Sequence, residues 1–189
     1  MNKHFRDYQP NQMFLLPMSF NDWLPKEHLV YFISDTVDQL DLSEIYDSYT
    51  ELRGYPPYAP IMMVKVMLYA FSLGVRSSRK IERKLYEDIA FRIISANQQP
   101  DYWTINDFRN RHLEALGRLF NQTIKLAGEA GLIKLGHVAI DGTKIKANAS
   151  KHSAMSYARM NEEEKRIQAI IDQYFREANA IDAEEDRLY

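Results

Sequence analysis

The chain has 189 residues, of which 46% are hydrophobic and 12% aromatic, enough for one sizeable domain or for one domain and part of a second. It contains no cysteine, which excludes disulfides and thiolate metal sites. Residues 1–60 carry 4 basic and 9 acidic side chains, residues 61–158 carry 15 and 8, and residues 159–189 carry 5 and 9, so the local balances are −5, +7 and −4. A basic middle suggests either a polyanion partner or an unevenly charged, solvated surface, while the pI near 6.2 argues against unspecific coating of nucleic acid.

The N-terminal segment has neither the apolar stretch nor the small-residue cleavage site of a signal peptide. The most apolar run, Ile61 to Val75, contains Lys65 and is shorter than the roughly 20 residues that a spanning helix needs. We therefore expect a cytoplasmic protein without a membrane partner, and a buried core helix over this run.

Helical periodicity begins at His28. Residues 28–40 carry apolar side chains at i, i+3 and i+4 spacing after Pro25, and residues 42–49 predict a second short helix. A proline-rich stretch precedes the core helix, which is expected to begin near Ile61 and to end at Gly74.

A basic helix is predicted next, over residues 76–84, with Ser77 or Ser78 as its N-cap. Its sequence, RSSRKIERK, contains five basic residues and a single acid, Glu82. Residues one turn apart share a helix face, which makes this segment the best candidate for contacts with DNA phosphates. The candidate contacts are Arg76, Arg79, Lys80, Arg83 and Lys84.

A long helix is predicted from Thr104 to Gly128, with Thr104 and Asp107 as a capping box. Arg109, near its start, is a further candidate DNA contact if this helix acts as the second element of a helix-turn-helix-like arrangement.

The pattern changes at Val138–Ile140, where β-branched residues predict a strand that leads into Asp141 and Gly142. One strand and a tight Asp-Gly hairpin both fit this pattern. From Tyr157 onward the spacing is helical again, with acidic runs that include Asp182 and residues 184–186, which we interpret as a solvated face. The predicted fold is therefore mainly α, with a helical N-terminal domain, a short β-strand or hairpin, and a long charged C-terminal helix.

Two tracts together resemble the N-terminal part of bacterial insertion-sequence transposases with a DDE catalytic domain. The first, residues 54–109, reads GYPPYAPIMMVKVMLYAFSLGVRSSRKIERKLYEDIAFRIISANQQPDYWTINDFR. The second, residues 138–157, reads VAIDGTKIKANASKHSAMSY. The resemblance implies a helical N-terminal domain over residues 1–135, and the start of a ribonuclease-H-like catalytic domain over residues 136–189.

The resemblance also implies that Asp141 is the first of three catalytic carboxylates that hold two divalent ions, Mg²⁺ or alternatively Mn²⁺, for phosphodiester cleavage and strand transfer. Lys144 and Lys146 follow it closely and are candidate phosphate contacts. The second Asp and the Glu lie beyond Tyr189 on this comparison, so we expect the chain by itself to bind no metal and to be catalytically incomplete.

Two functions remain open on the sequence. The chain is either an N-terminal fragment of a DDE transposase, or a non-catalytic DNA-binding or dimerising module derived from one. In both cases the expected partner is double-stranded DNA, with transposon ends as the target for the transposase. A second copy of the chain or the missing C-terminal half are further candidate partners, and association with the bacterial nucleoid is expected when DNA is bound.

Overall fold

A computed structural model describes residues 19, 22–49, 57–129 and 157–188. These residues form eight helices joined by turns and bends, and they contain no β-strand. The helices are α1 (Leu29–Val37), α2 (Ser43–Asp47), α3 (Pro60–Ser72), α4 (Ser78–Glu87), α5 (Ile89–Ile94), α6 (Tyr102–Arg111), α7 (Leu113–Glu129) and α8 (Tyr157–Leu188).

The predicted fold class needs correction. We expected a short strand or hairpin after the helical domain, whereas the described part of the chain is all helix and connecting turns. The residues that carried the strand prediction, 137–150, lie outside the described residues. The long C-terminal helix that was predicted from Tyr157 is confirmed as α8.

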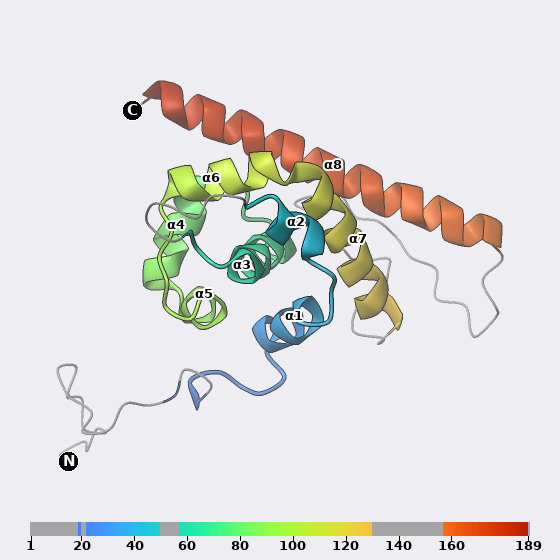
Figure 1. The fold of residues 1–189 in the computed structure, drawn as a ribbon, viewed down its shortest axis with the longest axis horizontal. Helices are drawn as coiled ribbons and strands as arrows, with labels where there is room; N and C mark the ends of the chain where they lie inside the picture. Colours follow the sequence, from blue (N-terminus) through green and yellow to red (C-terminus); the bar gives the residue numbers. More distant parts are fainter. Residues whose placement is uncertain (1–18, 20–21, 50–56, 130–156, 189) are drawn as a thin grey trace, which may run out of the picture.

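Helix α3 is the centre of the domain. It lies among the other helices of the N-terminal part, while α8 runs as a long rod along one side (Figure 1). Ten of the 13 residues of α3 are buried, which agrees with a helix that is apolar on nearly every side. Pro60 occupies its first turn, and Gly74, with φ of +68°, follows its C-terminal end. The predicted core helix is therefore confirmed at both ends.

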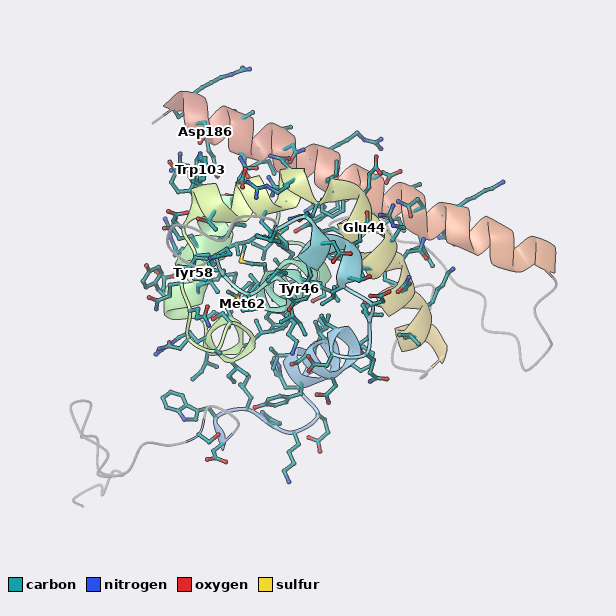
Figure 2. All side chains as sticks on the ribbon, viewed as in Figure 1. Glu44, Tyr46, Tyr58, Met62, Trp103 and Asp186 are labelled. Atoms are coloured by element: carbon teal, nitrogen blue, oxygen red, sulfur yellow. The ribbon has the colours of Figure 1, made fainter. Side chains whose placement is uncertain are left out.

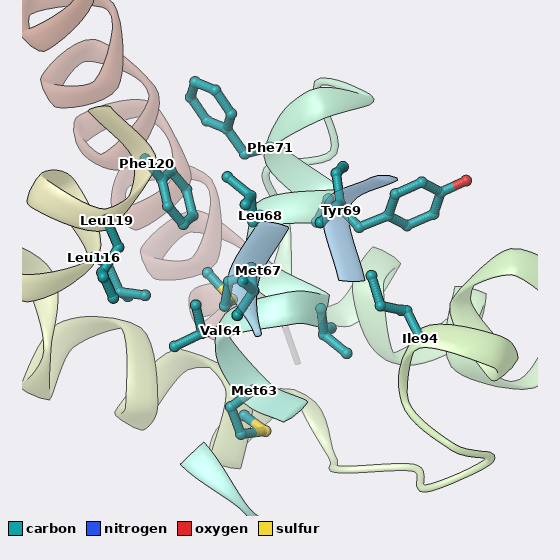
Figure 3. Packing of buried hydrophobic residues seen from close by; sticks show 14 of the residues in the cluster. Met63, Val64, Met67, Leu68, Tyr69, Phe71, Ile94, Leu116, Leu119 and Phe120 are labelled. Atoms are coloured by element: carbon teal, nitrogen blue, oxygen red, sulfur yellow. The ribbon is translucent and has the colours of Figure 1, made fainter. Parts of the chain in front are cut away.

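Side chains of α3 fill the space between α5 and α7. Figure 3 shows Val64, Met67 and Leu68 between Leu116, Leu119 and Phe120 of α7 on one side and Ile94 of α5 on the other. Burying a large apolar side chain contributes about 1.5–3 kcal/mol, so this layer is a major source of stability for the domain.

Helix α8 is attached to this core by aromatic contacts. The ring of Tyr174 lies edge-on to Phe71 of α3 at 4.8 Å, and the ring of Phe175 lies 5.5 Å from Phe120 of α7. The Tyr174 hydroxyl donates a hydrogen bond of 2.6 Å to the carbonyl oxygen of Val75. Burial raises the pKa of Tyr174, so the hydroxyl remains a neutral donor. α8 is thus packed against the core through its middle.

Two local predictions differ from the structure. The single helix that was predicted from Thr104 to Gly128 is divided at His112, where φ of −114° and ψ of 24° depart from helical values and the imidazole stacks on Tyr49 at 5.8 Å. Neither glycine nor proline marks this position, so the division depends on tertiary packing. Helix α5, capped by Asp88, was not predicted.

Candidate nucleic-acid interface

The basic helix forms as predicted, and its N-cap is now identified. The Ser77 side chain accepts a hydrogen bond of 3.1 Å from the backbone N–H of Lys80, which satisfies one of the unpaired donors at the start of α4. Ile81 and Leu85 are fully buried against the core, which turns the opposite side of the helix to solvent.

Lys80 and Arg83 lie on this solvent-facing side, three residues apart, and both are exposed. Within the described part of the chain, neither side chain forms an ion pair. Lys84, the next basic residue, lies 3.3 Å from the Asp88 carboxylate and is partly buried. Lys80 and Arg83 are therefore the predicted contacts that present their charge to solvent.

Two other predicted contacts, Arg76 and Arg79, face acidic side chains of α8. Arg76 forms an ion pair of 2.6 Å with Glu177. Arg79 forms an ion pair of 2.8 Å with Asp186, which Figure 2 labels at the C-terminal end of α8. In both pairs, a basic residue from the middle of the chain binds an acidic residue of α8.

Arg109 is a wholly buried cation, with an exposed fraction of 0%. Its guanidinium donates to the Asp182 carboxylate at 2.6 Å, to Asn106 at 2.8 Å and to Asn179 at 3.1 Å, and it also reaches the carbonyl oxygen of Arg76 at 3.2 Å. A buried guanidinium with this number of acceptors is characteristic of a structural ion pair. Its charge is neutralised inside the protein.

Asp182 is also buried, with an exposed fraction of 5%, and the expectation that it belongs to a solvated face is wrong. Besides Arg109, it accepts from the backbone N–H of Ser78 at 2.8 Å and from the Ser78 hydroxyl at 2.5 Å. Sequence reasoning missed this partner of Arg109, although a signal was present. Asp182 continues the apolar stripe of Ile171, Tyr174 and Ala178, whose members are three or four residues apart, and an acid on such a stripe needs a buried partner.

The predicted catalytic acid, Asp141, and the neighbouring Lys144 and Lys146 lie outside the described residues. Among the described residues, no group of three or more His, Asp or Glu side chains could hold a metal ion. None of the described helices is long and apolar enough to cross a membrane.

The comparisons with known proteins point to one family. Residues 18–111 match the family model described as "Transposase domain (DUF772)", a span that includes α1 to α6 and therefore the basic helix. No curated protein and no solved structure is significantly similar to the chain. The helix that carries Lys80 and Arg83 is thus part of a recognised transposase domain, and residues 18–111 of this chain belong to the DUF772 transposase-domain family.

Proposed function

We propose that the chain is the DNA-binding N-terminal part of an insertion-sequence transposase of the DDE type. The observation that carries the proposal is the exposed pair of Lys80 and Arg83 on a helix inside the transposase domain. Cations of this kind bind DNA through its phosphates, a contact that orients the protein on the duplex and releases counterions.

The buried geometry refines the set of proposed contacts. Arg109 is assigned to the fold, because its donors are used by Asp182, Asn106 and Asn179. Lys80 and Arg83 are assigned to the DNA.

The catalytic part of the proposal concerns Asp141. In DDE chemistry three carboxylates hold two Mg²⁺ ions, one of which activates the attacking water or 3′-hydroxyl while the other stabilises the leaving oxygen. Asp141 would supply one of these carboxylates, and Lys144 and Lys146 would lie near the phosphates. This assignment is supported by the family resemblance of residues 138–157.

The DNA proposal is tested by Lys80→Ala/Arg83→Ala. Loss of two phosphate contacts should weaken binding to duplex DNA and reduce the slope of log affinity against log salt by about 1.8, since each contact contributes about 0.9. Fluorescence anisotropy with a labelled duplex at several salt concentrations measures both quantities.

Lys165→Ala/Arg166→Ala is the matched control. It removes the same charge from two exposed residues of α8 without touching α4. An equal loss of affinity and slope in both variants would show that only total charge matters, and the assignment of Lys80 and Arg83 would be wrong.

The catalytic proposal is tested by Asp141→Asn in a fusion that adds a segment with the second Asp and the Glu after Tyr189. The substitution keeps the side-chain shape and removes the ligand charge, so strand transfer with Mg²⁺ should be lost while DNA affinity stays unchanged. Substantial strand transfer by the Asn variant would refute the role of Asp141.

A further inference from the structure

The last turn of α8 lies against the first turn of α4. The Ser77 hydroxyl, which also caps α4, donates a hydrogen bond of 2.7 Å to the Glu185 carboxylate. One residue further along α8, Asp186 holds the guanidinium of Arg79 at 2.8 Å. Two neighbouring acids of α8 thus lie at one end of the basic helix.

The acid on Arg79 makes the contact that a DNA phosphate would make. Guanidinium groups bind carboxylates and phosphates through the same forked N–H donors. The Arg79 guanidinium also lies 3.7 Å from the centre of the Tyr102 ring, a stacking that holds it flat and leaves its edge for an anion. Asp186 therefore occupies a donor edge that is already oriented.

Arg79 continues the row formed by Lys80 and Arg83. It precedes Arg83 by four residues, one turn of α4, so its side chain emerges on the same side of the helix. A phosphate backbone lying along Lys80 and Arg83 would meet Arg79 next. In the structure Asp186 is paired with Arg79, so the phosphate backbone would meet this acid there.

The pair between Arg79 and Asp186 can be exchanged more readily than the buried pair of Arg109 and Asp182. The side chains of Arg79 and Asp186 are 28% and 51% exposed, against 0% and 6% for Arg109 and Asp182. Ion pairs open to solvent are weak, whereas buried ones are costly to break. The end of α8 can therefore release Arg79 while Asp182 keeps the helix in place.

We propose that Arg79 is able to form a third phosphate contact on the DNA-binding surface and that Glu185 and Asp186, at the end of α8, hold it away from DNA. This inference rests on the proposed DNA-binding function and adds an internal competitor to it. α8 then sets the strength of DNA binding through its terminal acids.

The experiment uses Glu185→Gln/Asp186→Asn, which removes both charges and keeps hydrogen-bonding groups of similar size. Released from Asp186, Arg79 should add one phosphate contact. The log–log salt slope should then rise by about 0.9, and the loss of affinity between 50 and 200 mM salt should be about 3.5-fold larger than in the wild type.

The matched control is Asp172→Asn/Glu184→Gln, which neutralises two exposed acids of α8 other than Glu185 and Asp186. A gain beyond this control that disappears when Arg79→Gln is added supports the inference. Equal affinity and slope in the two double variants, or a gain that survives Arg79→Gln, overturns it.

The two proposals fail in different ways. If the wild type binds duplex DNA through Lys80 and Arg83 but Glu185→Gln/Asp186→Asn behaves as the control does, only the competition is refuted. If neither the wild type nor this variant binds duplex DNA at 50 mM salt, the proposed DNA-binding function is refuted as well.

Discussion

Asp182 links three helices through one carboxylate. From α8 it accepts two hydrogen bonds from Ser78 of α4 and pairs with Arg109 of α6. Because both charged groups are buried, each compensates the desolvation of the other. Removing one of them leaves an uncompensated charge inside the protein.

We expect Asp182→Ala to lower the free energy of unfolding by about 3–5 kcal/mol, the usual cost of breaking a buried ion pair from one side. Urea denaturation followed by circular dichroism measures the change. Glu184→Ala, two residues away and exposed, is the control and should stay within about 0.5 kcal/mol of the wild type.

A double variant tests the cause of this loss. In Arg109→Met/Asp182→Leu neither charge remains, so the total loss should be smaller than the sum of the losses from Arg109→Met and Asp182→Leu. Additive losses would indicate that the two residues stabilise the protein independently of each other.

At the scale of secondary-structure elements, the helix starts show which signals are local. Ser77, one of the two predicted caps, caps α4. Helix α6 instead begins at Tyr102 and is capped by Asp101, whose carboxylate accepts a hydrogen bond of 2.7 Å from the backbone N–H of Thr104. The predicted cap, Thr104, lies inside the first turn. Both residue types cap helices well, so the sequence alone left this choice to the surrounding packing.

We therefore predict that Asp101→Ala destabilises the protein by about 1 kcal/mol, the typical contribution of an N-cap side chain. Thr104→Ala, which removes the side chain at the expected cap, should change stability by no more than about 0.5 kcal/mol. Thermal or urea unfolding of the two variants decides between the caps, and the reverse order would favour the original prediction.

At the scale of the whole molecule, ion pairs within the fold account for part of the uneven charge of the sequence. The basic middle of the chain was expected to meet a polyanion, yet Arg76, Arg79 and Arg109 meet acids of the C-terminal third. Part of the positive charge is thus neutralised within the fold. Lys80 and Arg83 remain exposed on the transposase domain, and the proposed DNA contact is concentrated on them.

Local sequence patterns predicted most of the helices, and the resemblance of two tracts indicated a transposase. Apolar spacing and terminal signals act over a few residues, so α1, α2, α3, α4 and α8 could be predicted from neighbouring side chains, as could the C-terminal end of α3 at Gly74. The same local rules did not reveal α5 or the division between α6 and α7. They also favoured a strand, whereas the described residues contain only helices and connecting segments.

Which basic residues face solvent depends on the packing of distant helices. Ser78 and Asp182 are 104 positions apart, and Arg109 and Asp182 are 73 apart, so no local pattern connects them. The pairs form because the apolar stripe of α8 packs on α3 and α7, which brings the acids that follow this stripe onto α4 and α6. A basic residue in the sequence is a potential DNA contact, but the packing of a distant helix decides whether its charge faces solvent or a carboxylate.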